Sequence, residues 1–391
     1  MSNHPMKKDN INPYIRLDFL DSLRFFAIVY VVISHLRVIP EPNLMIPEWI
    51  APFIINGGSA GVSLFFVLSA FSLSYSMDAR AGEAMLTRRF YIRRFFRIVP
   101  LFYLMMLVYW IRDAAIFGLL HPVSEVLVNA SLLFNLIPAF ITGFVWASWT
   151  IGVLILLYLL FPLIHRYIRN LPAALTLFVA SILMARGWSF FVINYGELTG
   201  YLTPDQMNYV WGFGFLQNLP MFVCGVITYR LFSDYFIKMT QKARYMAGLL
   251  FIMSFLFLYA ALLTGRLQNI LWETKTWQGI CFSLLVLGLG LRPFSFLVNS
   301  KTVYLGKASY SMYLFHPILT FTFVPVYYWC YDHLSADLSG FSVSLLITLI
   351  PLTVISLISY KYIERPGISW GEKLISRRWP INRLDREQKS H

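Results

Sequence analysis

The chain alternates between long apolar stretches and shorter polar connections that are rich in Lys and Arg. A helix needs about 20 apolar residues to cross a bilayer, and in lipid it satisfies its own backbone hydrogen bonds. The pattern therefore predicts an all-α membrane protein with about ten transmembrane helices. The predicted spans lie near 22–39, 57–77, 98–117, 149–168, 172–192, 209–231, 245–264, 276–291, 308–330 and 341–362.

An eleventh apolar stretch, 126–144, is interrupted by two asparagines and a proline. If it does not cross the membrane, 26 of the 32 Lys and Arg residues fall on one side. The positive-inside rule makes that side cytoplasmic, and counting 126–144 as a span would destroy the asymmetry. We therefore expect a re-entrant or interfacial segment on the outer face, and both termini on the cytoplasmic side.

Composition agrees with a membrane protein, because 58% of the residues are hydrophobic and only 13% are charged, against roughly 25% charged in soluble domains. The first twenty residues are polar and lack the layout of a cleavable signal. We expect a cytoplasmic N-terminal segment at 1–21, a transmembrane domain at 22–366 and a cytoplasmic C-terminal tail at 367–391, in the cytoplasmic (inner) membrane of the cell. The net charge of +13 follows from this topology, so no nucleic-acid partner is expected. The three cysteines have no metal-binding spacing, and no metal is expected.

Two polar residues lie within the first span, Arg24 and His35. Eleven residues correspond to about 16.5 Å and three turns plus roughly 20°, so both side chains share one helix face. A charged side chain at bilayer depth costs about 2.5 kcal/mol or more and marks a functional site by default. His35 suits a general base near neutral pH. The alternative is that its imidazole only bonds a neighbouring helix.

A basic run, TRRFYIRRFFRIVP, precedes the third span. Arg94 and Arg97 in this run are three residues apart and share a helix face. Paired guanidinium groups suit the bidentate binding of phosphate oxygens. The alternative is a topology anchor that touches only lipid phosphates.

Six motifs in order resemble the acyltransferase-3 family of integral membrane O-acyltransferases over residues 18–366. They are R-x10-H in the first span, GVSLFFVLSAF at 61–71, RRFFRIVPLFY at 93–103, SWTIGVLILLYLLFPL at 148–163, LGKASYSMYLFHPI at 305–318 and YIERP at 362–366. The resemblance implies transfer of an acyl group, usually acetyl from acetyl-CoA as donor substrate, to a hydroxyl of a surface glycan or glycolipid. It implies that His35 is catalytic and that Arg24, Arg94 and Arg97 hold the donor. Trp149 and Tyr313 are further candidates within these motifs.

One motif departs from the family pattern. Family members commonly read WSLSVEEQFYL where this chain reads WTIGVLILLYL, so Leu154 and Ile155 replace an acidic pair. The role of those carboxylates must be absent here or be supplied by another residue.

Two further candidates have structural interpretations. His316 precedes Pro317, which frees a carbonyl in the preceding turn for a His or Tyr side chain. Glu364 in YIERP could pair with a nearby arginine. A secondary transporter or flippase of a polysaccharide precursor also needs buried Arg and His, although the chain shows no internal repeat of the kind that many transporters have.

Overall fold

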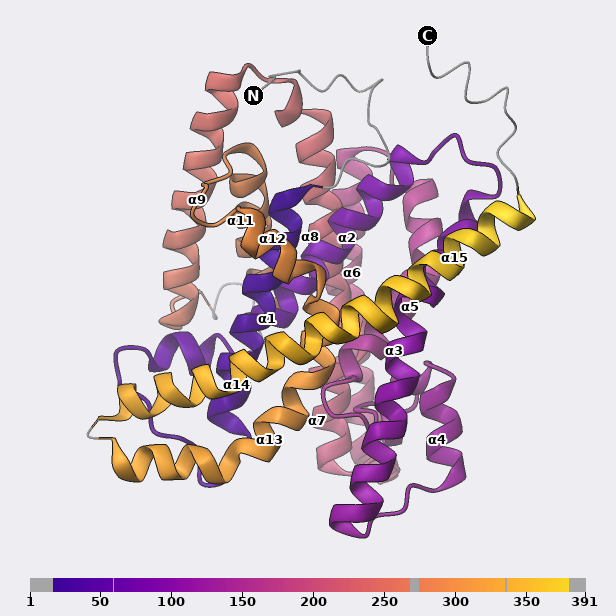
Figure 1. Ribbon diagram of the computed structural model, residues 1–391. Coiled ribbons are helices and arrows are strands. Elements are labelled where there is room, and N and C mark those ends of the chain that lie inside the picture. Colours follow the sequence, from indigo (N-terminus) through magenta and orange to yellow (C-terminus); the bar gives the residue numbers. More distant parts are fainter. Residues whose placement is uncertain (1–16, 59, 268–273, 335, 380–391) are drawn as a thin grey trace.

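The computed structural model describes residues 17–58, 60–267, 274–334 and 336–379, and in these residues the regular structure is entirely helical. Long helices form a bundle, and shorter helices cover its ends (Figure 1). The elements are α1 Asp18–Val38, η2 Pro52–Asn56, α2 Ala60–Ala79, α3 Leu86–Phe117, α4 Val123–Ala130, η3 Phe134–Leu136, η4 Pro138–Phe140, α5 Trp149–Tyr167, α6 Leu171–Thr199, α7 Pro204–Phe213, α8 Phe215–Asp234, η5 Phe236–Lys238, α9 Gln241–Leu263, α11 Thr274–Leu291, α12 Ser300–Lys307, α13 Ser309–His333, α14 Asp337–Ser359, η6 Tyr360–Glu364 and α15 Arg365–Arg378.

The all-α multi-pass architecture is confirmed, but the number of spans is not. Within the described residues, eight helical segments are long and apolar enough to cross a membrane. The helices α11 and α13, which we predicted as two further spans, are not among them. The first turns of α11 carry Lys275 and Gln278, and α13 carries His316 and several hydroxyl groups within its apolar sequence. The count of ten therefore stays a prediction.

Two predicted spans differ from the helices that form. The helix α3 begins at Leu86, twelve residues before the predicted start, because the basic run continues the helix beyond its apolar part. The predicted span 209–231 is divided into α7 and α8 at Gly214, whose backbone is extended. A hydropathy pattern predicts neither the early start of α3 nor the division at Gly214. It depends on the length of an apolar stretch and not on backbone geometry.

The last span continues without a break into the predicted tail. The helix α14 passes through one π-helical turn, η6, into α15, and the combined helix crosses the bundle in Figure 1. Its end packs against α3, where Arg93 Nε donates to Glu372 Oε1 at 2.9 Å. Residues 365–378 are therefore helical and attached to the basic run.

The segment that we predicted to be re-entrant or interfacial forms only the short helices α4, η3 and η4. Its two asparagines are buried, and their side chains satisfy loop backbone groups. The amide of Phe144 donates to Asn129 Oδ1 at 3.3 Å, and Asn135 Nδ2 donates to the carbonyl oxygens of Ile141 and Phe213. Figure 1 places α4 at the opposite end of the bundle from the α2–α3 connection. The polar residues that interrupt the apolar pattern thus hold a folded loop together.

A histidine joins this segment to the end of α3. His121 lies 2.9 Å from Asp113 Oδ2 through Nε2 and 2.9 Å from Glu125 Oε2 through Nδ1. Burial alone would lower the pKa of His121, but the hydrogen bonds and charges of Asp113 and Glu125 outweigh it and raise the pKa above its usual value. The two carboxylates therefore favour the protonated form of the His121 imidazole, which bridges them.

This bridge predicts a pH-dependent contribution to stability. A group whose pKa is raised on folding contributes fully below its unfolded pKa of about 6.5 and loses the contribution as the pH rises through the folded value. The melting temperature of the detergent-solubilised protein should fall above about pH 6.5 more steeply in the wild type than in His121→Gln, which cannot titrate. Parallel curves for the two proteins would contradict the bridge.

Candidate active site

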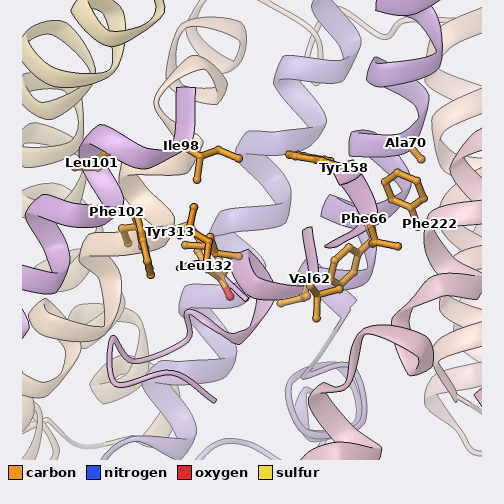
Figure 2. Close-up of a cluster of buried hydrophobic side chains, with 14 of the residues drawn as sticks. Val62, Phe66, Ala70, Ile98, Leu101, Phe102, Leu132, Tyr158, Phe222 and Tyr313 are labelled. Atoms are coloured by element: carbon orange, nitrogen blue, oxygen red, sulfur yellow. The ribbon is translucent and has the colours of Figure 1, made fainter. Parts of the chain in front are cut away.

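A cavity of about 100 Å³ lies between α1, α2, α3, α5 and α13. Figure 2 shows five of its lining residues, Val62, Phe66, Ile98, Tyr158 and Tyr313. The complete lining is Arg24, Val62, Phe65, Phe66, Ser69, Arg97, Ile98, Thr150, Ile151, Leu154, Tyr158, Ser309, Tyr310 and Tyr313. The walls are mostly apolar and aromatic, with two arginines and several hydroxyl groups. Such a lining is typical of a ligand site, in which a few polar groups fix orientation.

Arg24 is held in place at the cavity by two neighbours. Its Nη1 lies 2.6 Å from Asp21 Oδ1, one turn earlier on α1, and its Nη2 donates to Ser72 Oγ at 2.5 Å. Asp21 is fully buried, so its charge requires this partner. These contacts orient the guanidinium at the cavity wall. They also mean that removing Arg24 would take an ion-pair partner from a buried carboxylate.

Arg97 reaches the same cavity from α3. Among the described residues, no ion pair or hydrogen bond fixes its guanidinium. Glu364 lies close enough to interact with its charge. A cavity that is lined by two arginines and, in the described part of the chain, by no carboxylate favours an anionic ligand.

Arg94 does not line the cavity, although it is close to it. Its guanidinium carbon lies 5.6 Å from the ring centroid of Phe90 and 5.8 Å from that of Tyr158. Its charge interacts with those of Arg97 and Arg24. Of the predicted pair, only Arg97 therefore lines the cavity. Arg94 contacts the lining residue Tyr158.

Tyr313 is the lining residue that connects the cavity to the start of α5. Its hydroxyl donates to the carbonyl of Ala147 at 3.1 Å and accepts from Thr150 Oγ1 at 2.9 Å. Ala147 has a φ of +65°, a conformation that is uncommon for any residue except glycine and that often marks a functional site. The hydrogen bonds of Tyr313 thus attach α13 to the connection before α5, at Ala147, and to Thr150 in its first turn.

His35 and His316 meet next to Tyr313. Nδ1 of His35 lies 2.8 Å from Nε2 of His316, and the ring centroids of Tyr313 and His316 are 5.4 Å apart. Trp146 packs its ring edge-on to His35 at a centroid distance of 4.8 Å. Neither His35 nor His316 lines the cavity itself. Arg24 lies on its wall, and the two histidines adjoin it through the lining residue Tyr313. A shared site for Arg24 and His35 stays a prediction.

The other predicted residues lie near the site with different partners. Trp149 packs against Phe213 and Phe66 at the start of α5. Glu364 was predicted to form an ion pair with an arginine, and among the described residues it forms none. Its Oε1 instead accepts from both the amide and the hydroxyl of Ser311. The turn of η6 buries this carboxyl against the first turn of α13, where the amide and hydroxyl of Ser311 take the place of the expected cation. Amides in a first helical turn have no partner within the helix and are available for such a bond.

Sequence reasoning missed Trp146, Thr150 and Ser72 as members of the site. Trp146 lies in the irregular connection before α5, and its position depends on the backbone at Ala147. Ser72 and Thr150 are hydroxyl residues within apolar helices, where such residues commonly bond to their own helix. Leu154, by contrast, lines the cavity at the position where the family motif is acidic. The departure from the motif therefore makes the cavity wall apolar.

The fold and the site together define a multi-pass helical membrane protein whose bundle has a cavity lined by two arginines, with a pair of histidines beside it. The family model for this type of acyltransferase domain matches residues 17–361, nearly the whole described chain. The chain belongs to the acyltransferase-3 family, whose model describes an acyltransferase domain.

Two relatives have names that agree. The acyltransferase MdmB from Streptomyces mycarofaciens is 31% identical over 172 residues, which cover 40% of this chain and 41% of that protein. ORF330 of Acidianus two-tailed virus, which has been assigned as an acetyltransferase, is 24% identical over 326 residues, covering 81% of this chain and 86% of that protein. The chain thus aligns with less than half of the first relative's length. No solved structure matches the chain.

Proposed function

We propose that this protein transfers an acyl group, normally acetyl, from cytoplasmic acyl-CoA to a hydroxyl of a surface glycan or glycolipid, with His35 as the catalytic residue. The observation that carries the proposal is a cavity lined by Arg24, Arg97 and Tyr313, with the His35–His316 pair adjoining Tyr313. The arginines suit the phosphates of coenzyme A, and the imidazole suits the reacting end of the donor.

The positions along α1 explain how a cytoplasmic donor could serve an acceptor outside. Arg24 lies six residues after the first residue of α1, and His35 lies three residues before its last. Their helix positions differ by about 16.5 Å along the axis. In the proposed topology Arg24 is nearer the cytoplasm, so only the acyl end of an extended coenzyme A arm has to reach His35.

Two chemical routes are open for the proposed transfer. In the first, His35 takes the proton of the acceptor hydroxyl, the hydroxyl oxygen attacks the thioester carbonyl, and the carbon–sulfur bond breaks. In the second, His35 attacks the thioester itself and passes the acyl group on to the hydroxyl. Both routes release the thiol of coenzyme A and use a neutral imidazole.

Sealed membrane vesicles test the donor and its side of entry. Radiolabelled acetyl-CoA, which does not cross lipid, should label the glycan or glycolipid of inside-out vesicles, where the cytoplasmic face is exposed. Right-side-out vesicles should remain unlabelled until they are permeabilised. Mass spectrometry of surface glycans should show acetyl groups in cells with the gene and none of these groups in cells without it. Identical glycans, or labelling only of right-side-out vesicles, would contradict the proposal.

A further inference from the structure

The order of residues in α13 determines which nitrogen of His316 carries a proton. In a helix the amide of residue 317 would donate to the carbonyl of residue 313, but Pro317 has no amide hydrogen. His316 Nδ1 lies 2.6 Å from that carbonyl oxygen of Tyr313. A carbonyl only accepts hydrogen bonds, so Nδ1 of His316 is the donor.

This proton determines the state of the facing nitrogen. A neutral imidazole with hydrogen on Nδ1 has a lone pair on Nε2. His316 Nε2 faces His35 Nδ1 at 2.8 Å, so His35 Nδ1 must carry a hydrogen and donate it. The remaining nitrogen of His35, Nε2, then holds the lone pair.

No carboxylate takes part in this arrangement within the described part of the chain. His316 is fully buried, and the hydrogen bonds of its ring go to Tyr313 and His35. In a Ser-His-Asp site an aspartate holds the catalytic histidine in one tautomer. Here a second, neutral histidine, His316, bonds His35 in place of the aspartate. The carbonyl of Tyr313, which Pro317 leaves without its helical donor, orients His316.

We infer that His316 is a positioning residue that fixes the tautomer of His35, so that Nε2 of His35 is the atom that reacts. The inference rests on the proposed function for its catalytic part. In the direct route, the O–H bond of the acceptor breaks and its proton moves to His35 Nε2, while the oxygen bonds to the acyl carbon. The carbon–sulfur bond then breaks, and the departing thiolate takes the proton from Nε2. Throughout, Nδ1–H of His35 stays bonded to His316, which stabilises the transient imidazolium.

Two substitutions at position 316 separate positioning from packing. In His316→Gln, the amide oxygen can accept from His35 Nδ1–H, whereas in His316→Leu no acceptor remains. We expect His316→Leu to lower kcat at least about tenfold with little change in the KM for acetyl-CoA. His316→Gln should recover most of the lost kcat. Equal loss in both variants, or unchanged kcat in His316→Leu, would overturn the inference.

Nitrogen NMR of the resting protein gives a second readout that needs no donor and no acceptor. With ¹⁵N-labelled histidine, the signals of His35 are those that disappear in His35→Gln. They should show hydrogen on Nδ1 in the wild type and in His316→Gln. A mixture of tautomers, or hydrogen on Nε2, is expected in His316→Leu.

Pro317→Ala provides a variant that leaves both histidines in place. It returns an amide hydrogen that competes with His316 for the carbonyl of Tyr313, so the tautomer of His35 should become mixed. Hydrogen on Nδ1 of His35 in His316→Leu and in Pro317→Ala alike would overturn the inference. If the wild type showed the expected tautomer but no transfer from acetyl-CoA, the proposed function would fail and the positioning role of His316 would stand.

Discussion

His35→Ala is expected to abolish acyl transfer while the protein still inserts into the membrane and binds its donor. Loss of a general base costs roughly a hundredfold or more, and loss of a nucleophile that carries the acyl group costs more still. The substitution should leave the bundle intact, because the buried neighbours of His35 along α1, Val31, Val32 and Leu36, still pack into the core. The measurement is transfer from radiolabelled acetyl-CoA by purified variants in proteoliposomes, with donor affinity measured separately.

His333→Ala is a matched control for this experiment. His333 also lies on a long helix and also bonds a backbone carbonyl, that of Trp329, but it is exposed at the end of α13. Its removal should leave transfer unchanged. If His35→Ala still modified the glycan at the wild-type level, His35 would not be the catalytic residue. The transporter alternative would then be favoured.

Arg97→Ala is expected to weaken the binding of acetyl-CoA by roughly 10- to 150-fold, since a hydrogen bond to a charged group contributes about 1.5–3 kcal/mol. Arg97→Lys should weaken it less, because lysine keeps the charge but loses the planar fork that binds two phosphate oxygens at once. Arg94→Ala should have a smaller effect than Arg97→Ala, since Arg94 lies over Phe90 and Tyr158 and outside the cavity lining. Donor affinity can be measured by calorimetry on the purified proteins.

Arg93→Ala is the control for charge in the same basic run. Arg93 is paired with Glu83 and Glu372 at the end of the bundle, so it does not reach the cavity. Its loss should leave donor affinity unchanged. If Arg93→Ala and Arg97→Ala weakened binding equally, or if neither did, Arg97 would return to the role of a topology anchor.

The apolar pattern identified the long helices because a bilayer offers no alternative partner for backbone groups. It located most helix ends within a few residues, as for α5, predicted at 149–168 and observed at Trp149–Tyr167. It failed at α3 and at Gly214, where the helix continues through charged residues or breaks within an apolar stretch. Hydropathy depends on transfer to lipid, and these two features depend on local backbone geometry and on contacts with other helices.

For the site, the sequence determined that Arg24 and His35 share a face, since helix periodicity alone fixes that relation. It also determined that Pro317 frees the carbonyl that His316 then uses. These are local relations within one helix, and the structure contains the contact of His316 with the carbonyl of Tyr313.

Only the tertiary structure decided which residues of different helices meet. His35 faces His316 across 281 positions of sequence, and Arg24 bonds Ser72 on α2. The sequence likewise could not show that Glu364 accepts hydrogen bonds from Ser311 and forms no ion pair with an arginine among the described residues. Periodicity fixes the direction in which a side chain leaves its own helix, whereas the partner that it finds depends on how ten or so long helices pack against one another. That packing is set by close contacts spread over the whole bundle, which no single stretch of sequence contains.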